Sequence, residues 1–317
     1  MSKILIISEN DNIAFELLTA GKMLADGDAT LVAAVVLGGG AENRANAYLS
    51  RGAAKVITAG AGKEMMETFD AETYATAVAQ IAGKERATMI LTGCTRRGKE
   101  LAGRLAQKLG AACINDVKAI ECEGGEAVYS RNALGGATVC RQAVSSPVAV
   151  VSIMPSTFAQ ASEVPPVGET MVVDLELKPA RVRLVECQSK NTDSVDIAEA
   201  KTLVCVGMGL GGPEKLSVVE ELARVLGGEV ACTKPVATDQ KWLSEARMVG
   251  LSGKQCKPQL SLCMGLSGQV QFAVGIRDSK TIVAINTDEN ATIFQYADYG
   301  IVGDLNVITE KLIAQLK

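Results

Sequence analysis

Short unbroken apolar runs alternate with stretches of helical periodicity in the first third of the chain. The runs are residues 3–8, 30–37, 54–58 and 88–92. Each is paired with a stretch such as residues 11–26, where Ile13, Leu17 and Leu24 recur at helical spacing. Apolar runs without polar alternation are typical of strands that are buried on both faces of a parallel sheet. The alternation therefore predicts an α/β layer with a mostly parallel sheet.

Between residues 114 and 185 the apolar segments become shorter, and Gly, Ser or Pro separates them. The strands predicted here are residues 128–131, 137–141, 147–153 and 175–185. Pro155, Pro165 and Pro166 indicate a surface crossover before the last of these strands. The polar, acidic stretch at residues 186–199 predicts a linker. We therefore expect an N-terminal domain at residues 1–190, a linker at 191–200 and a C-terminal domain at 201–317.

The second domain opens with an apolar strand that leads into a glycine-rich loop and a helix. Gly207, Gly209 and Gly212 match the G-x-G-x-x-G spacing of dinucleotide-binding loops. That fingerprint also requires an acidic residue about 20 residues further on, at the end of the next strand. Glu229 lies near this distance but precedes the strand at 230–232, so the match is incomplete. A stand-alone nicotinamide-dependent dehydrogenase is the alternative function that this loop supports.

Residues 249–304 combine further apolar runs with small residues that let a ligand approach the backbone closely. Glycine has no Cβ to block such an approach. The glycines of this kind are Gly250, Gly253, Gly265 and Gly268. Ser252 and Ser267 add hydroxyls that donate and accept, and a predicted buried strand at 281–285 presents Asn286 at its end. Because open parallel sheets bind ligands at the carboxyl ends of their strands, this stretch predicts a nucleotide site built from several strand ends.

In these residues the chain resembles the alpha subunit of electron-transfer flavoproteins. The resemblance is carried by Ser252, Ser267-Gly268, residues 278–286 and residues 297–300, and it is specific from about Val204 onward. It implies two α/β domains with mostly parallel sheets, of which the C-terminal one is a Rossmann-like FAD-binding domain. It also implies a heterodimer with a beta subunit, in which most of the subunit interface belongs to the first domain.

The resemblance implies an electron carrier without substrate turnover of its own. The expected redox partners are dehydrogenases of the acyl-CoA type, or other flavin or iron–sulfur proteins. Some members of the family relay electrons, whereas others bifurcate electrons from NADH with a second FAD in the beta subunit. The second FAD site lies on the beta subunit, so the sequence of this chain is compatible with both electron relay and electron bifurcation.

The resemblance also implies a set of FAD-binding residues, and no catalytic or metal-binding residue. The set is Met208, Thr233, Lys234, Val249, Gly250, Leu251, Ser252, Ser267, Gly268, Gln269, Val270, Gln271, Phe272, Asn286, Asp304 and Leu305. Ser252 would donate a hydrogen bond to flavin N5, and residues 267–272 would line the pyrophosphate and the flavin edge. Asn286 and Asp304 would bind the adenosine half. Taken singly, these side chains also suit a helix cap (Ser252), a turn (Asn286) and a helix N-cap (Asp304). Because they occur together in the family's order, the cofactor roles are the ones that the resemblance favours.

Three of these positions depart from the family pattern in groups that tune a flavin. Lys234 and Met208 stand where the family usually has arginine, and Phe272 stands where many members have a histidine that hydrogen-bonds the flavin. Lysine keeps the charge but lacks the planar guanidinium fork, and phenylalanine offers no donor. The departures concern the redox properties of the flavin more than its binding, and they predict weaker stabilisation of negative charge on the ring.

Two other stretches could suit a phosphate. The glycines at residues 38–40 follow a predicted strand, and either a phosphate loop or a strand-to-helix turn fits them, although nothing downstream completes a phosphate motif. The stretch 92–100 sets Arg96 and Arg97 at a helix start, where anions are favoured. Since the resemblance places FAD in the other domain, we interpret this stretch as a solvated or partner-facing helix start whose two arginines pair with carboxylates. Cys94 has no identifiable base for a nucleophilic role.

Composition excludes several function classes. The 317 residues are 48% hydrophobic and 21% charged, which indicates a globular chain of two domains. The net charge of −4 gives no basic surface for nucleic acid, and no apolar run reaches the roughly 18 residues of a membrane span. The nine cysteines include no C-x-x-C pair, and without a predicted signal peptide they indicate reduced thiols in the cytoplasm. Histidine is absent, which removes the commonest metal ligand and general base and suits chemistry that belongs to a bound cofactor.

Overall fold

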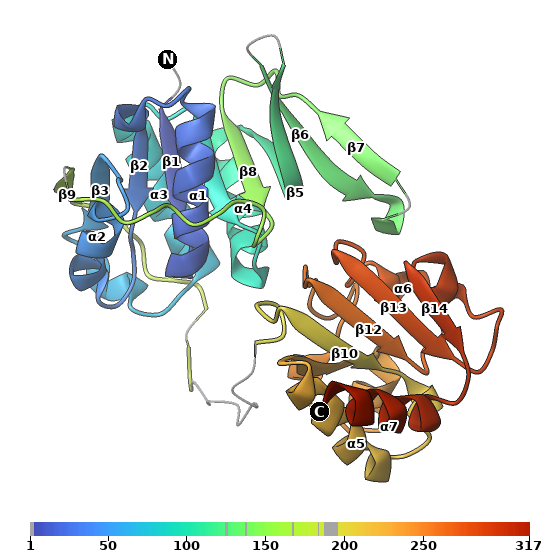
Figure 1. The fold of residues 1–317 in the computed structure, drawn as a ribbon. Coiled ribbons are helices and arrows are strands. Elements are labelled where there is room, and N and C mark those ends of the chain that lie inside the picture. The colour runs from blue at the N-terminus through green and yellow to red at the C-terminus, as the bar shows by residue number, and fades with distance from the viewer. Residues whose placement is uncertain (1–2, 124–125, 137, 167, 183, 187–195) are drawn as a thin grey trace. The chain divides into compact units, whose positions relative to one another are not determined.

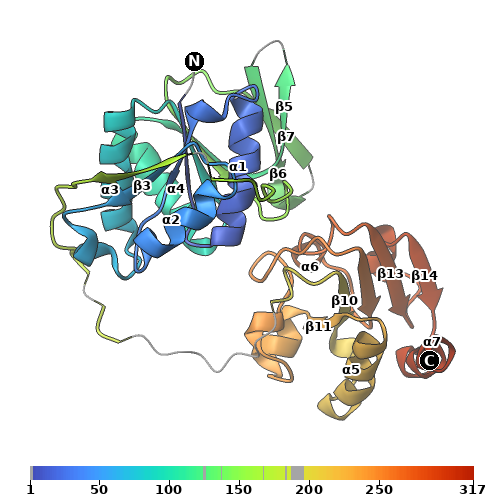
Figure 2. The ribbon, with the colours of Figure 1, turned by 60° about the vertical axis from the view of Figure 1, so that its left-hand side comes forward.

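The computed structural model describes residues 3–317 except 124–125, 137, 167, 183 and 187–195. The described chain divides into two compact units, and the boundary between them lies near residue 187. The first unit holds the residues up to Glu186 apart from Leu134–Gly136, and the second unit holds the remainder. Each unit is an α/β structure with its own sheet (Figure 1 and Figure 2).

The first unit is built on a nine-stranded sheet with the order β7-β6-β5-β8-β4-β1-β2-β3-β9. Its strands are β1 (Ile4–Ile7), β2 (Val32–Val35), β3 (Lys55–Ala59), β4 (Met89–Gly93), β5 (Ala112–Glu123), β6 (Glu126–Ala133), β7 (Thr138–Gln142), β8 (Ala149–Ile153) and β9 (Glu169–Val173). Its helices are α1 (Asp11–Leu24), α2 (Ala41–Leu49), α3 (Ala71–Glu85) and α4 (Arg96–Leu109). Neighbouring strands are parallel except in the β5–β6 and β6–β7 pairs. The mostly parallel sheet confirms the fold class that the apolar runs predict.

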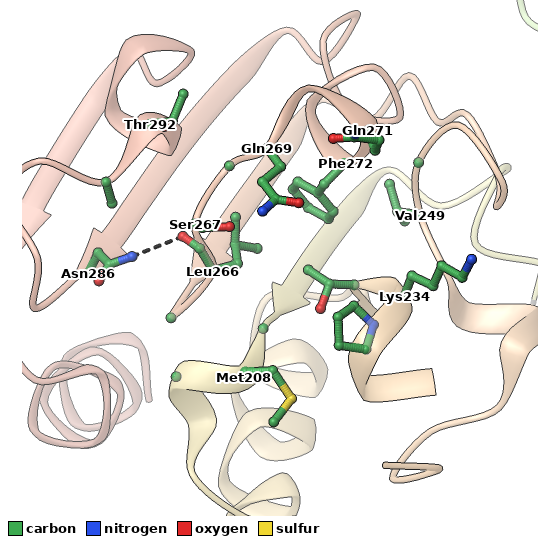
Figure 3. A pocket seen from close by; sticks show the side chains of 18 of the residues that line it. Met208, Lys234, Val249, Leu266, Ser267, Gln269, Gln271, Phe272, Asn286 and Thr292 are labelled. Carbon is green, nitrogen blue, oxygen red and sulfur yellow. Dashed lines mark hydrogen bonds between the residues drawn. The ribbon is translucent and has the colours of Figure 1, made fainter. Parts of the chain in front are cut away.

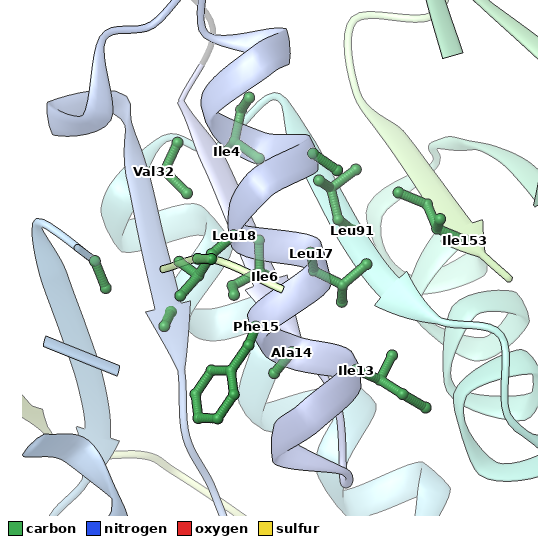
Figure 4. Close-up of a cluster of buried hydrophobic side chains, with 14 of the residues drawn as sticks. Ile4, Ile6, Ile13, Ala14, Phe15, Leu17, Leu18, Val32, Leu91 and Ile153 are labelled. Carbon is green, nitrogen blue, oxygen red and sulfur yellow. The ribbon is translucent and has the colours of Figure 1, made fainter. Parts of the chain in front are cut away.

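Two hydrophobic clusters cover the two faces of this sheet. On one face Ile4 and Ile6 pack with Leu18 of α1, as Figure 4 shows, and the cluster extends to α2. On the other face Leu5 and Ile7 pack with buried residues of α3 and α4. Successive side chains of a strand point to opposite faces. A central strand that is covered on both sides must therefore be apolar at every position, which explains the unbroken run at its place in the sequence.

The prediction of a strand at residues 175–185 is wrong, because the described residues of this stretch form no strand. The edge strand of this region is β9, which ends at Val173 and pairs with β3. The chain after β9 is tied to α3 instead, because Gln80 Nε2 donates to the backbone carbonyl of Glu176 at 2.7 Å. Val185, one of the apolar residues that suggested a strand, is 84% exposed and has no sheet to pack against.

Sequence analysis also missed β5, which pairs antiparallel with β6. A register shift between Ile114 and Val117 interrupts its pairing with β8, so its side chains do not alternate regularly. Asp116 lies within this shift with a φ of 61°. Its Oδ1 accepts a hydrogen bond from Cys94 Sγ at 3.2 Å and lies 2.6 Å from Lys99 Nζ. The irregular strand therefore anchors the start of α4.

Replacing Asp116 with asparagine is expected to lower the free energy of unfolding by about 1–2 kcal/mol at pH 7. Burial alone would raise the pKa of this carboxyl, but the hydrogen bonds from Lys99 and Cys94 outweigh burial and lower it. A lowered folded-state pKa contributes stability above the unfolded pKa of about 3.9, and that contribution is lost as the pH falls through the folded value. Urea unfolding should therefore show a smaller difference between Asp116→Asn and the natural protein at about pH 3 than at pH 7. Equal differences would contradict the charge contribution.

The second unit is built on a five-stranded parallel sheet with the order β11-β10-β12-β13-β14. Its strands are β10 (Thr202–Val206), β11 (Glu229–Cys232), β12 (Leu260–Met264), β13 (Thr281–Asn286) and β14 (Tyr299–Val302). Its helices are α5 (Leu216–Val225), α6 (Val270–Ala273) and α7 (Leu305–Leu316). One face of the sheet is covered by α5 and α7. The other face is covered mainly by irregular segments, whose buried side chains include Val249, Cys256, Leu266, Phe272, Ile276 and Ile293.

Part of the stretch that we expected as a linker packs into the second unit. Ile197 is fully buried in the cluster beneath the irregular segments. Asp196 Oδ1 lies 2.7 Å from Lys254 Nζ. The second unit therefore includes residues 196–200, whereas residues 191–195 lie outside the described residues.

Candidate functional site

A cavity of about 530 Å³ lies at the carboxyl ends of four strands of the second sheet. Its walls are the segments that follow β10, β11, β12 and β13, together with a loop at residues 248–253. Figure 3 shows side chains from these segments around one space. The volume is in the range of cofactor sites, and open parallel sheets bind their ligands at this edge.

Most of the predicted site residues line this cavity. They are Met208, Thr233, Lys234, Val249, Gly250, Leu251, Ser252, Ser267, Gly268, Gln269, Gln271, Phe272 and Asn286. Val270, Asp304 and Leu305 are not among the lining residues. Val270 is 49% exposed, and Leu305 is buried in the cluster under α7.

Asp304 is the N-cap of α7, which is the alternative that the sequence left open. Its Oδ1 accepts a hydrogen bond from the backbone N–H of Asn306 at 2.7 Å. This backbone hydrogen bond, followed by one from the Asn306 side chain, lowers the pKa of the Asp304 carboxyl. Capping therefore accounts for one oxygen of this carboxylate, and its contact with a cofactor stays a prediction.

The G-x-G-x-x-G loop lacks the geometry of a dinucleotide fingerprint. The backbone N–H groups of Gly207, Gly209 and Gly211 donate to backbone carbonyls at 3.1, 2.8 and 3.1 Å, so they are not available to a pyrophosphate. A Cβ on Gly207 or Gly209 would lie 2.5 or 2.7 Å from backbone atoms of Gly265. These two glycines therefore allow the loops after β10 and β12 to pack together. Helix α5 begins only at Leu216.

Glu229, the acidic residue considered for a ribose, lies at the start of β11, whereas the cavity lies at the carboxyl end of that strand. Its carboxylate is 3.3 Å from the Arg247 guanidinium. Neither the phosphate-binding part nor the ribose-binding part of the fingerprint is therefore formed. These observations argue against a nicotinamide-dependent dehydrogenase.

The loop after β12 offers backbone donors to the cavity. Among the hydrogen bonds within the described part of the chain, none uses the N–H groups of Ser267, Gly268, Gln269 or Gln271. Gly268 fixes the loop against the neighbouring wall, since it has a φ of 79° and a Cβ there would lie 2.3 Å from Ile293 Cα. The Ile293 N–H donates to the Ser267 carbonyl at 3.0 Å. A run of unpaired N–H groups in a cavity wall suits the oxygens of a phosphate.

The loop at residues 248–253 carries Ser252 at the tip of a tight turn, so its alternative role as a helix cap is not found. The Gly253 N–H donates to the Gly250 carbonyl at 3.0 Å and closes this turn. The Leu251 N–H donates to the Gln271 carbonyl at 2.7 Å, which ties the tip to α6. The Ser252 side chain is exposed, and within the described residues its hydroxyl has no hydrogen-bond partner. It is available to a ligand in the cavity.

Asn286 joins two walls of the cavity. Its Nδ2 donates to the Leu266 carbonyl at 2.9 Å (Figure 3), and its Oδ1 accepts from the Asp288 N–H at 3.0 Å. Both polar ends of the side chain are therefore engaged within the protein. Asn286 has the turn role that the sequence left open, and it positions the loops on either side of it.

The three departures from the family pattern all lie at the cavity. Phe272 is only 6% exposed and belongs to the hydrophobic cluster beneath the loops. Met208 is 44% exposed, and Lys234 is exposed beside it in the lining. In the part of the chain that the structure describes, Lys234 has no acidic partner. The cavity therefore presents one unpaired ammonium group and a buried aromatic ring at these positions.

Sequence analysis missed the segment after Asn286. Asp288, Asn290, Ala291 and Thr292 all line the cavity. The signal in the sequence was a polar run directly after a predicted buried strand, because such a run must lie at the carboxyl edge of the sheet.

The other stretches considered from the sequence have structural roles. The three glycines at residues 38–40 form the strand-to-helix turn before α2. The carboxylate pairing expected of Arg96 and Arg97 is not found among the described residues, and Arg97 lies over the Phe69 ring at 5.3 Å instead. Burial raises the pKa of the Cys94 thiol to about 11, so the thiol is protonated and a poor nucleophile at neutral pH.

Within the described residues, no group of three or more His, Cys, Asp or Glu side chains is arranged to hold a metal ion. None of the described helices has the length and apolar character that crossing a membrane requires.

Residues 4–180 match the electron transfer flavoprotein domain, and residues 196–277 match the electron transfer flavoprotein FAD-binding domain. The chain belongs to the electron-transfer flavoprotein family. Much of the cavity wall of this flavoprotein subunit lies within the second matched region, and the wall formed by residues 286–292 lies beyond it.

Curated relatives agree with this assignment and indicate an alpha-type subunit in electron transfer. Protein FixB of Escherichia coli O81 (strain ED1a) is 40% identical over 229 residues, which are 72% of this chain and 73% of the relative. Protein FixB of Escherichia coli O157:H7 is 39% identical over 247 residues, 77% of this chain and 79% of the relative. The solved structure of MurG from Acinetobacter baumannii gives a TM-score of 0.33 at 11% identity, covering 100% of this chain and 90% of that one; this likeness supports no comparison of sites.

Proposed function

We propose that this flavoprotein subunit binds FAD in the cavity of its second unit, as one half of a heterodimer with a beta subunit. The observation that carries the proposal is the run of unpaired N–H groups at residues 267–271, set between Ser252 and Asn286 in the cavity wall. A diphosphate requires several such donors. The match of residues 196–277 to an FAD-binding domain supports FAD over other nucleotides.

The residues present fit the cofactor. A Cβ on Gly250 or Gly268 would lie 2.4 Å from the Gln271 carbonyl oxygen or 2.3 Å from Ile293 Cα, so both glycines let neighbouring segments of the wall pack closely against each other. Ser267 is exposed in the lining and adds a hydroxyl beside the unpaired N–H groups. The donor set therefore combines neutral amides and hydroxyls, as a bound diphosphate requires.

When bound, FAD would supply one- and two-electron chemistry at its ring. The Ser252 hydroxyl would donate a hydrogen bond to the flavin, and the Lys234 ammonium would favour negative charge on the ring. Phe272 contributes an apolar wall without a donor. Asn286 holds the loop 266–271 in place, and Asp304, Leu305 and Val270 stay proposed contacts of the cofactor outside the cavity lining.

The proposed partners follow from the family. The first unit contributes most of the interface with the beta subunit, and the redox partners are dehydrogenases of the acyl-CoA type or other flavin or iron–sulfur proteins. The cysteines of the described residues are free, which favours a reducing compartment such as the cytoplasm.

Copurification with the beta subunit tests this proposal. The heterodimer is expected to be yellow and to release FAD on denaturation. One FAD per heterodimer indicates a simple relay, and two indicate bifurcation with a second site on the beta subunit. A colourless heterodimer that takes up no added FAD contradicts the proposal, and so does a chain that is stable and FAD-loaded as a monomer.

Replacing Ser252 with alanine is expected to retain FAD and to lower the reduction potential of the flavin. A hydrogen bond to a group that gains charge contributes about 1.5–3 kcal/mol, which corresponds to about 65–130 mV for one electron. Potentiometric titration of the heterodimer measures the shift. Ser217→Ala, on the exposed surface of α5, is the matched control. An unchanged potential in Ser252→Ala means that the hydroxyl does not face the ring.

A further inference from the structure

Charge is distributed unevenly around the cavity. Of the described side chains that line it, only those of Lys234 and Asp288 are charged. Lys234 follows β11, whereas Asp288 follows β13, and the two strands β10 and β12 lie between β11 and β13 in the sheet. In Figure 3, Asn286 and Thr292, which flank Asp288 in the sequence, lie on the opposite side of the cavity from Lys234. The cavity therefore has a cationic side and an anionic side.

Two consecutive turns hold Asp288 in a defined position. Asn286 Oδ1 accepts from the Asp288 N–H at 3.0 Å, and Asp288 Oδ1 accepts from the Asn290 N–H at 2.9 Å. The Asp288 carbonyl accepts from the Ala291 N–H at 3.1 Å. Within the described residues, the second carboxylate oxygen of Asp288 has no hydrogen-bond partner. One oxygen thus fixes the loop and the other is left for a ligand.

The chemistry of a carboxylate determines which part of a ligand can lie beside it. It accepts hydrogen bonds and cannot donate them, and it repels phosphate oxygens. In the adenosine diphosphate half of FAD, the donors are the ribose hydroxyls and the adenine amine. The unpaired N–H groups of Ser267, Gly268, Gln269 and Gln271 would accommodate the phosphates separately. The diphosphate of FAD adjoins the adenosine ribose on one side and the ribityl chain on the other, and the cationic Lys234 side suits the flavin, which leaves the ribose for the Asp288 side.

We propose that Asp288 accepts a hydrogen bond from a ribose hydroxyl of the adenosine half of FAD and thereby selects this dinucleotide and its orientation. The inference rests on the proposed FAD site. The adenosine half would then lie on the Asp288 side of the cavity, and the flavin ring would lie on the Lys234 side. A nucleotide with a phosphate on that hydroxyl is rejected, because two anions would then meet.

Asp288→Asn tests the inference, since asparagine keeps an oxygen for the Asn290 N–H and replaces the free oxygen with an amide NH2 group, which donates and does not accept. Glu289→Gln is the matched control: it removes the same charge one residue away, and Glu289 is exposed and does not line the cavity. With the heterodimer, FAD affinity is expected to fall about 10- to 100-fold in Asp288→Asn. It should change less than about twofold in Glu289→Gln, and the affinity for FMN, which has no adenosine, should be the same in all three proteins.

Displacement by ADP analogues identifies the atom that is recognised. The natural protein should bind ADP more tightly than 2′-deoxy-ADP or 3′-deoxy-ADP, and Asp288→Asn should lose this preference. Equal binding of all three by the natural protein overturns the ribose contact and assigns the carboxylate to the adenine amine or to no contact. Unchanged FAD affinity in Asp288→Asn, or equal losses in both variants, overturns the inference but leaves the FAD site intact. A natural heterodimer that binds no FAD overturns the inference and the proposed function together.

Discussion

Gly268→Ala is expected to reduce FAD affinity at least 100-fold, the largest effect of any single methyl group at the cavity. The added Cβ would lie 2.3 Å from both the Cα and the backbone N of Ile293, closer than any real Cβ contact. The φ of 79° is also unfavourable for a residue with a side chain, at about 1–2 kcal/mol. The loop of residues 266–271 must therefore move away from Ile293, which displaces the donors proposed for the pyrophosphate. A loss of about 3 kcal/mol in binding free energy corresponds to an affinity that is lower by at least about 100-fold.

Fluorescence titration with FAD measures this loss, and urea unfolding reports the accompanying change in stability. Gly103→Ala is the control, because Gly103 lies within α4 and a Cβ there meets no atom within 4 Å. Alanine in a helix is favoured over glycine by about 1 kcal/mol, so this variant should be as stable as the natural protein or more stable. Normal FAD affinity in Gly268→Ala would show that the loop does not hold the cofactor.

Asn286→Leu is expected to weaken FAD binding by about 10- to 50-fold, because its side chain holds the loops on both sides of the cavity. Leucine has nearly the same size but removes the hydrogen bonds to Leu266 and Asp288, each contributing about 1 kcal/mol. Both loops that those bonds hold should then loosen. Hydrogen exchange without FAD should be faster at the amides of residues 266–271 and 288–292. Asn46→Leu, on the exposed side of α2, controls for an added surface leucine.

The exchange measurement distinguishes positioning from direct contact. If Asn286→Leu lowers FAD affinity but leaves exchange at residues 266–271 unchanged, the side chain must contact the cofactor itself. If neither changes, Asn286 has no role at the site. Only the combined change supports Asn286 as the residue that joins the two loops.

The sequence was most informative where one physical constraint determined each position. The run Ile4–Ile7 could be recognised because a central strand covered on both faces tolerates only apolar side chains. Gly250 and Gly268 were recognisable as sites of close approach, but the atoms that approach them in the structure belong to Gln271 and Ile293 and not to a ligand. The strand prediction for residues 175–185 failed. A sequence with apolar residues such as Val185 has the composition of a strand whether or not a sheet offers a free edge for it to pair with. Neighbouring strands, and not local composition, decide that question.

At the site, the same polar residue often serves two purposes that the sequence does not distinguish. Asp304 could bind a ligand or cap a helix, and only the 2.7 Å hydrogen bond from Asn306 shows that it caps. Asp288 was overlooked because its neighbours resemble an ordinary polar loop. Its place in the cavity depends on the turn that Asn286 imposes two residues earlier. Such contacts arise from the folded loop, so local patterns could not reveal them.

Among the described residues, much of the cover on one sheet face of the second unit comes from loops that also form the cavity, together with the short α6. A ligand that binds these loops therefore also seals the core beneath them, and its binding energy adds to the stability of the unit. Newly made chains that wait for a cofactor would keep Val249 and Phe272 under a loosely held cover. Cellular proteases act on such transient openings. The supply of riboflavin-derived cofactor would then govern how much of this protein a cell retains, as well as how much of it is active.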